Sequence, residues 1–173
     1  YGKQRSPQRE NKKNSQETYW TYGNAKLLST KFLLEQKKKY NFPITILRLY
    51  LVYGPKQDLN RLIPITIMNA LKKVKFNCSA GKQLRDFVYI DDLINAIVKT
   101  FKNEKSNGEI INVGSGNPIS VKKLIIKICK LANGGNPQFG KVSLRKDEIF
   151  KLYPSLKKVK KILNWQAKVN LDK

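Results

Sequence analysis

The chain has 173 residues, of which 40% are hydrophobic, and a formal net charge of +23, values that suit one folded domain or part of a larger one and argue against global disorder. No apolar run approaches the roughly 20 residues of a membrane span, and the polar N-terminus lacks a signal-peptide core, so we expect a cytoplasmic protein without a membrane partner. The positive charge comes mostly from lysines scattered over polar helix faces rather than from an arginine-rich stripe, so nucleic acid is not the expected partner.

The first part of the chain is predicted to contain a loop, a helix and a strand. Residues 1–18 are polar, as is typical of a loop. A helix is expected over about 22–39, because leucines recur along it and three lysines close it at the negative end of the helix dipole. The run "ITILRLYLVYG" at 44–54 is nearly all β-branched or apolar. Such a run is typical of a strand covered on both faces in a parallel sheet.

Shorter elements alternate along the rest of the chain. Helical periodicity is seen at 61–72, 91–103, 120–132 and 154–165, and short strands are expected at 75–80, 85–90 and 109–114. Asp91 is expected to cap the second of these helices. This alternation predicts an α/β protein. A change of composition near residues 54–60 suggests a sheet-based part, 1–54, and a smaller lobe, 55–173.

Metal chemistry is not indicated by the composition. The chain has no histidine, and its two cysteines, Cys78 and Cys129, lie far apart among apolar neighbours. A zinc site needs more soft ligands than these, and a disulfide framework needs more cysteines. No metal site is therefore predicted, and both cysteines are expected to be small buried residues in a reducing compartment.

Tyr22 and Lys26 are four residues apart near the start of the first predicted helix. Residues at this spacing lie on one face of a helix, so the lysine ammonium can stand beside the phenol. An ammonium favours the phenolate form and makes the phenol a better general base near neutral pH. The alternative is an ordinary surface tyrosine beside a lysine whose stem packs along it, and this spacing alone does not separate the two.

The order of several short motifs favours the first alternative. In sequence come "YGNAK", "LRLYLVYGP", "NRLIP", "GKQLRDFVYIDDL", "INVGSG", "LRKDEI" and "KKILNW". This order and spacing resemble the C-terminal portion of the extended short-chain dehydrogenase/reductases that act on nucleotide sugars, with Tyr1 and Gly2 similar to the end of the family's "VYG" element. The resemblance implies the C-terminal part of a Rossmann-like parallel sheet plus a smaller α/β substrate-binding lobe.

Carried over residue by residue, the resemblance makes Tyr22 the acid/base that exchanges a proton with a sugar hydroxyl. Lys26 would hold the ribose of NAD or NADP and stabilise the phenolate form of the tyrosine. Tyr50 would lie along the nicotinamide. The helix that carries Tyr22 and Lys26 would also form the interface of a homodimer.

The same resemblance places the substrate, a nucleotide-diphosphate sugar, against the second lobe. Arg85 and Arg145 match arginines that clamp the diphosphate, for which a planar guanidinium is well suited. The other residues expected at the substrate are Leu51, Arg61, Phe76 and Asn112. Leu51 is a departure, because the family usually has an asparagine there. From the residues alone, Arg85 could instead pair with Asp86 or Asp91, and Asn112 could cap a strand end.

The glycine-rich turn that seats a dinucleotide pyrophosphate is not among the 173 residues. The "GSG" at 114–116 follows a strand, but Ile119 occupies the third-glycine position, so a simple turn is predicted. The family's catalytic Ser or Thr would precede Tyr1, so we expect a fragment of a longer protein.

The sequence is compatible with three enzyme activities and with one binding role. The leading expectation is a sugar 4-epimerase serving polysaccharide biosynthesis, with a 4-keto reductase or a 4,6-dehydratase as alternatives. A non-catalytic basic binding module is the alternative from another class.

Overall fold

The computed structural model describes residues 4–10, 21–145 and 147–171. Tyr1 and Gly2, used in the sequence comparison, lie outside the described residues. The helices are α1 (Thr21–Tyr40), α2 (Leu62–Leu71), α3 (Ile90–Phe101), α4 (Val121–Leu131) and α5 (Lys157–Leu163), with a short 3-10 helix, η1 (Glu104–Ser106). The strands are β1 (Thr45–Leu49), β2 (Leu51–Tyr53), β3 (Lys75–Cys78), β4 (Leu84–Arg85), β5 (Phe87–Tyr89), β6 (Glu109–Val113), β7 (Ile119–Ser120), β8 (Asn136–Phe139) and β9 (Lys151–Leu152). Among these helices none is long and apolar enough to cross a bilayer.

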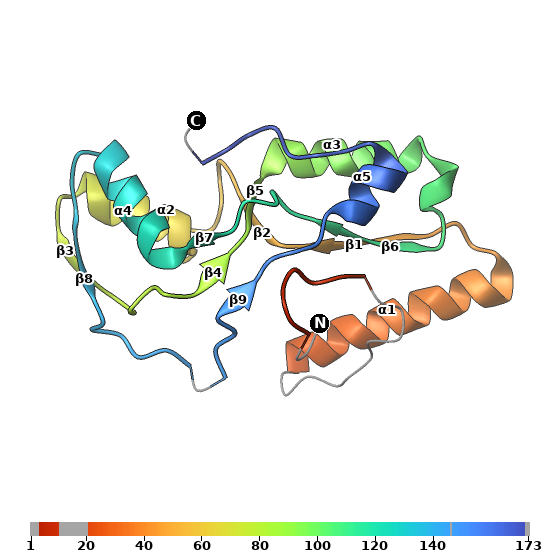
Figure 1. The fold of residues 1–173 in the computed structure, drawn as a ribbon, viewed down its shortest axis with the longest axis horizontal. Helices are drawn as coiled ribbons and strands as arrows, with labels where there is room; N and C mark the ends of the chain where they lie inside the picture. The colour runs from red at the N-terminus through yellow and green to blue at the C-terminus, as the bar shows by residue number, and fades with distance from the viewer. Residues whose placement is uncertain (1–3, 11–20, 146, 172–173) are drawn as a thin grey trace.

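Most strand pairs are parallel, as the alternation of helices and strands predicted. β1 pairs with β6, β2 with β5 and β3 with β8, all in parallel, and β4 lies between parallel β9 and antiparallel β7. The molecule is elongated, and helices lie at both of its ends (Figure 1). The α/β class is therefore confirmed, although β7, β8 and β9 were not predicted from the sequence.

The long apolar run at 44–54 forms two strands rather than one. At Tyr50 the backbone changes partner: its N–H donates to the Val113 carbonyl of β6 at 3.0 Å, and the next N–H, of Leu51, donates to the Asp86 carbonyl at 3.1 Å. The segment thus pairs first with β6 and then with β5. The predicted strand at 85–90 divides in the same way at Asp86, between β4 and β5.

The first helix is longer than predicted by a residue at each end, and none of its residues is buried. Leu28, Phe32 and Leu33 are exposed, and apolar residues lie around the whole circumference of α1 rather than on one stripe. Figure 1 shows α1 along one edge of the molecule, below β1 and β6. A helix of this kind is suited to being covered from more than one side.

Two sets of buried apolar residues stabilise the fold. One set packs α3, α5 and Trp165 against β1, β2 and β6, and the Trp165 indole N–H donates to the Asp92 carbonyl at 3.2 Å. The other set packs α2 against α4 with β3 and β5. The first set joins residues from both sides of position 54, and the division into 1–54 and 55–173 stays a prediction.

One predicted cap is wrong. The N-cap residue of α3 is Tyr89, with no side-chain hydrogen bond, and Asp91 lies within the first turn. Asp91 therefore contributes its charge at the positive end of the helix dipole rather than a capping bond. Ser120, in contrast, caps α4, since its hydroxyl accepts from the Lys123 N–H at 3.2 Å.

Candidate active site

Tyr22 and Lys26 lie side by side in the first turns of α1. The Lys26 Nζ is 5.4 Å from the centroid of the Tyr22 ring. Tyr22 is 76% exposed and Lys26 is also exposed. The helix spacing therefore brings the ammonium and the phenol together as predicted, on a surface that a ligand can reach.

Tyr50 lies at the break between β1 and β2, where it contacts the N-terminal segment. Its hydroxyl donates to Gln8 Oε1 at 2.8 Å. Gln8 is fully buried, and its backbone bonds with Tyr153 and Ser155 hold it beside β9. Sequence reasoning missed Gln8, because it belongs to a polar stretch with no pattern that distinguishes it from a loop.

Asn112, at the end of β6, is held by the same N-terminal segment. Its side-chain amide donates to the Gln8 carbonyl at 2.9 Å, and its backbone N–H donates to Glu10 Oε1 at 2.8 Å. The whole residue is buried. Asn112 thus links β6 to residues 8–10.

Arg85 forms an ion pair, but with neither of the acids considered from the sequence. Its guanidinium pairs with Glu148, which lies just before β9, and the two side chains are 12% and 18% exposed. The guanidinium also donates to the carbonyls of Leu84 and Ile149, at 2.8 and 2.7 Å. Burial lowers the pKa of Arg85, while the neighbouring Glu148 acts in the opposite direction. This arrangement ties β4 to the segment that carries Arg145.

Asp86 holds the turn that follows β6. Its carboxylate accepts from the backbone N–H groups of Ser115 and Gly116, at 2.6 and 2.7 Å. Burial raises the pKa of this fully buried carboxyl, and the hydrogen bonds from the turn partly offset that rise. A Cβ on Gly114 would stand 2.8 Å from the carboxylate, so the close approach requires glycine. The amides of the "GSG" turn already bind a carboxylate, which agrees with the prediction of a simple turn rather than a dinucleotide phosphate loop.

A cavity of 660 Å³ lies between β2 and the start of α2. Three of the predicted residues, Tyr50, Leu51 and Arg61, line it together. Its remaining lining residues come from the same two elements, from the loop that joins them and from β5: Val52, Tyr53, Gln57, Asp58, Asn60, Leu62, Ile63 and Phe87. The volume is within the range of pockets that hold small organic ligands.

The other predicted residues lie outside this cavity. Phe76, on β3, packs against the buried cluster of Cys78, Val121 and Ile125. Arg145 is exposed in the segment before β9, where its carbonyl accepts from the Glu148 N–H at 3.1 Å. The structure therefore joins some of the predicted residues and separates others, and their roles stay predictions.

This combination of fold and residues defines a class of protein. Residues 1–114 match the model of the NAD dependent epimerase/dehydratase family. The chain belongs to this family, and the resemblance found in the sequence is confirmed.

Two sequence relatives illustrate the range of the family. The chain is 31% identical over 136 residues to a UDP-glucuronate 4-epimerase of Thermodesulfobacterium geofontis, a match that covers 77% of this chain and 41% of that protein. It is 30% identical over 129 residues to a CDP-abequose synthase of Salmonella muenchen, covering 73% of this chain and 44% of that protein. The chain thus spans less than half the length of either relative.

Two solved structures have a fold similar to that of this chain. UDP-glucose 4-epimerase of Thermotoga maritima, solved with UDP-glucose, superimposes with a TM-score of 0.81 at 27% identity, covering 87% of this chain and 49% of that one. A dTDP-glucose 4,6-dehydratase of Bacillus anthracis, solved with NAD, has a TM-score of 0.85 at 21% identity, covering 99% of this chain and 54% of that one. At that identity the second match shows the fold alone.

Proposed function

We propose that this chain supplies the substrate-binding lobe and part of the catalytic centre of a cytoplasmic, NAD(P)-dependent enzyme that modifies a nucleotide-diphosphate sugar. A sugar 4-epimerase serving polysaccharide biosynthesis is the leading activity. The observation that carries the proposal is the exposed pair of Tyr22 and Lys26 on α1, in a chain that belongs to the epimerase/dehydratase family. The UDP-sugar 4-epimerases among the relatives support this choice of reaction.

The described residues fit one end of the cofactor. Tyr22 and Lys26 present a phenol and an ammonium on an accessible helix face, where they would meet the nicotinamide ribose, and Tyr50 would lie along the nicotinamide ring. The turn at 114–116 does not fit the pyrophosphate, because its amides are bound to Asp86. When bound, NAD(P) supplies reversible hydride transfer at the sugar carbon.

Within this chain, Tyr22 moves the proton. Its phenolate oxygen would accept a proton from a sugar hydroxyl and return it at the end of the reaction. Lys26 stabilises the negative phenolate through its nearby ammonium, an interaction favoured where solvent is excluded. The same two groups serve a 4-keto reductase or a 4,6-dehydratase, which are therefore the alternatives.

The substrate is proposed to lie along the second lobe. Arg61 and Leu51 line the 660 Å³ cavity beside Tyr50, and this grouping supports a sugar or phosphate contact there. Leu51 supplies no hydrogen bond from its side chain, so Arg61 is the polar group of this pair. Asn112 and Phe76 would contribute by shaping the walls behind the site, since their side chains are held by other residues.

Arg85 and Arg145 are proposed to bind the diphosphate. Glu148 occupies the Arg85 guanidinium in this structure, as a carboxylate does at an anion site. A diphosphate would replace that carboxylate, because two phosphates carry more charge and match the guanidinium fork. Arg145, which lies three residues before Glu148 in the same segment, would also bind the diphosphate.

The exposed apolar residues of α1 support a homodimer through that helix. Leu28 and Phe32 lie on α1 without a covering element among the described residues. Burying such residues between two copies would stabilise the pair by roughly 1.5–3 kcal/mol for each fully buried side chain.

Steady-state kinetics of the active enzyme that contains this chain test the proposal. Tyr22→Phe keeps the ring but removes the ionisable oxygen, so turnover should fall about 100- to 10,000-fold while nucleotide-sugar affinity stays within a few fold. Lys26→Met should also lower turnover and weaken cofactor binding. Tyr40→Phe is the matched control, since Tyr40 is an exposed tyrosine at the far end of the same helix.

Two outcomes would contradict the proposal. A Tyr22→Phe enzyme with normal turnover would exclude the tyrosine as the proton carrier. Nucleotide-sugar binding without any turnover in the unmodified enzyme would favour the non-catalytic binding module instead.

A further inference from the structure

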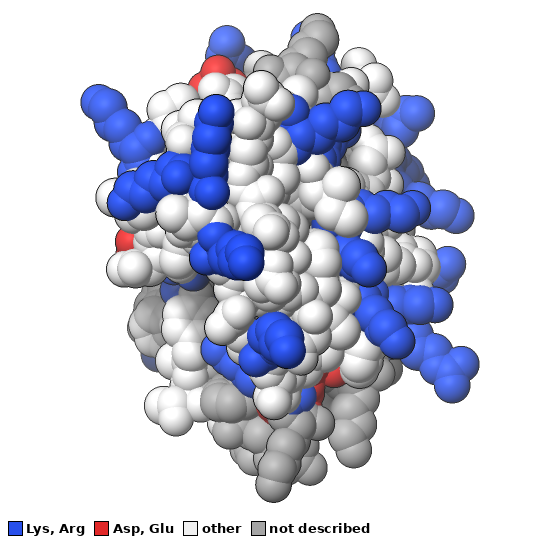
Figure 2. Space-filling model, turned by 90° about the vertical axis from the view of Figure 1, so that its left-hand side faces the viewer, with Lys and Arg blue, Asp and Glu red and all other residues white. Residues whose placement is uncertain are grey.

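Two stretches of the sequence that fold together lack acidic residues, so their net positive charge is high although their share of lysine and arginine is ordinary. Residues 59–85 and 110–146 contain none of the chain's 12 Asp and Glu. They contain thirteen of its 35 Lys and Arg, namely Arg61, Lys72, Lys73, Lys75, Lys82, Arg85, Lys122, Lys123, Lys127, Lys130, Lys141, Arg145 and Lys146. The two stretches meet because β3 pairs with β8 and α2 packs against α4. Figure 2 shows this end of the molecule, with basic side chains across the face and few acidic ones.

The helices α2 and α4 both end on an exposed leucine at this end of the molecule. Leu71 is 65% exposed and Leu131 is 70% exposed. The two helix ends lie close together, because a Cβ on Gly134 would stand 2.5 Å from the Ala70 carbonyl oxygen. Lysines flank both leucines, so apolar and basic side chains share one surface. We call Leu71, Leu131, Lys72, Lys75 and Lys130 the basic tip.

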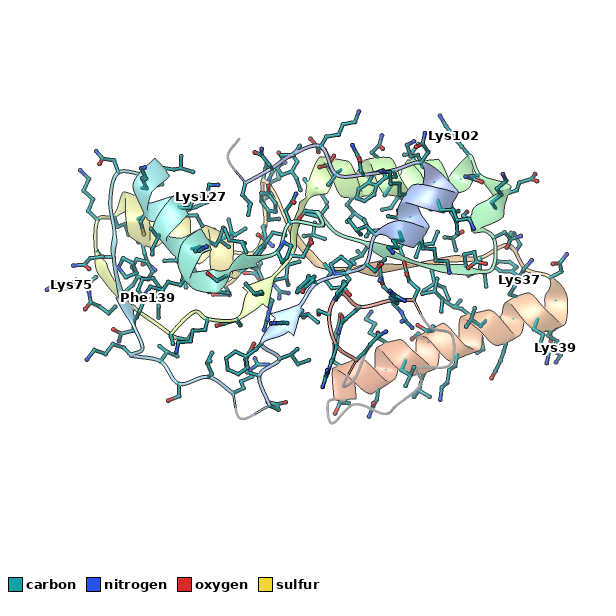
Figure 3. All side chains as sticks on the ribbon, in the orientation of Figure 1. Lys37, Lys39, Lys75, Lys102, Lys127 and Phe139 are labelled. Atoms are coloured by element: carbon teal, nitrogen blue, oxygen red, sulfur yellow. The ribbon has the colours of Figure 1, made fainter. Side chains whose placement is uncertain are left out.

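An apolar groove of 540 Å³ runs beside the basic tip. Its walls include Ile67, Met68, Leu124 and Ile128, and Leu131 stands at its edge. Lys56 and Lys127 also line it. Lys75 and Lys127 are both seen at this end of the molecule in Figure 3. The surface therefore combines apolar area with positive charge, which is the pattern of proteins that bind at a membrane interface.

We infer that the basic tip docks on an anionic phospholipid bilayer. Its lysines would lie at the headgroup phosphates, where each contributes about 1 kcal/mol near an anionic surface. Leu71 and Leu131 would enter the boundary between headgroups and acyl chains, beside the groove. This inference depends on the surface alone and not on the proposed catalytic activity.

The composition of the tip favours a bilayer over nucleic acid. All its charges are lysines, whereas bidentate phosphate contacts in nucleic-acid recognition commonly use arginine. The three arginines of this lobe lie elsewhere. Arg61 is at the 660 Å³ cavity, Arg85 is paired with Glu148. Arg145 is exposed in the segment before β9. Exposed leucines contribute little to binding a phosphate backbone but do stabilise insertion between lipids.

Co-sedimentation of the whole enzyme that contains this chain with vesicles tests this inference. Vesicles of phosphatidylcholine alone are compared with vesicles of equal parts phosphatidylcholine and phosphatidylglycerol. Binding should require the anionic lipid and weaken with added salt. Replacing Lys72, Lys75 and Lys130 with Gln should lower the partition coefficient about 100-fold. Replacing Leu71 and Leu131 with Ser should lower it several-fold with the charge unchanged.

The matched control removes the same charge from another surface. Lys157, Lys160 and Lys161 are exposed lysines of α5, and their change to Gln should alter the partition coefficient by no more than a few fold. Circular dichroism checks that each variant is folded. Equal losses in the two lysine variants would mean that net charge alone drives binding and would overturn the inference. Displacement from the vesicles by double-stranded DNA at equal phosphate concentration would overturn it in favour of nucleic acid.

Discussion

Replacing Asp86 by Asn tests how the turn after β6 is held. The Asp86 carboxylate is fully buried and accepts two backbone hydrogen bonds, from Ser115 and Gly116. Asparagine has nearly the same shape, but its amide offers one acceptor oxygen and one donor group. One of the two turn amides would therefore face a donor and lose its partner.

The expected change in the free energy of unfolding follows from two opposing effects. Hydrogen bonds to a charged acceptor contribute about 1.5–3 kcal/mol each, and an unpaired buried donor costs about 1–3 kcal/mol. Asparagine also removes the cost of burying a charge, which is the reason that the pKa of Asp86 lies above its ordinary value of 3.8. We expect Asp86→Asn to lower the free energy of unfolding by about 2 kcal/mol at neutral pH. The matched control Asp91→Asn, in an exposed first-turn position, should lower it by less than about 1 kcal/mol.

The stability difference between the unmodified chain and Asp86→Asn should change with pH in a definite direction. Well below pH 3.8 the carboxyl is protonated in both the folded and the unfolded chain. As the pH rises from that value to the raised pKa of the folded state, the unfolded chain releases this proton first. The contribution of Asp86 to the free energy of unfolding therefore falls across that window and is constant above it. The stability gap between the unmodified chain and Asp86→Asn should be widest at acidic pH and should narrow as the pH rises.

Urea denaturation followed by far-ultraviolet circular dichroism, at several values between about pH 3 and pH 7, measures the stability difference between the two chains and its dependence on pH. Comparing the two chains at each pH cancels the other carboxyl groups. Equal stability of the two chains at every pH would refute the role given to the carboxylate. A gap that widens with rising pH would refute the direction assigned to the pKa of Asp86.

Two further predictions concern ligand binding and the core. Calorimetry with a nucleotide sugar should show that Arg85→Ala weakens binding by about 1.5–3 kcal/mol, the contribution of charged hydrogen bonds, whereas Lys157→Ala has little effect; equal losses would mean that affinity comes from diffuse charge. In urea denaturation, Trp165→Phe should lower the free energy of unfolding by about 1–2 kcal/mol, because a phenyl ring cannot donate the hydrogen bond that the indole N–H gives to the Asp92 carbonyl. An unchanged free energy for this variant would show that the hydrogen bond contributes nothing.

The positions of the helices and the division of the strands show where sequence patterns are informative. The helix predicted over 22–39 lies at Thr21–Tyr40, because its signals, leucine periodicity and terminal lysines, act within one helix. The long apolar run at 44–54 was predicted as one strand and forms two. Its change of partner at Tyr50 depends on β5 and β6, which lie much later in the chain. Apolar composition indicates a strand but does not say which strand pairs with it.

The amino-acid sequence alone determined the α/β class, the family and the contact between Tyr22 and Lys26, because helix geometry sets the neighbours of residues four apart. Only the tertiary structure decided that Arg85 pairs with Glu148, that Asp86 holds Ser115 and Gly116, and that Tyr50 bonds Gln8. These partners are separated by 63, 29, 30 and 42 positions. Contacts over such separations depend on how strands and loops pack, and local propensity and periodicity carry no information about them.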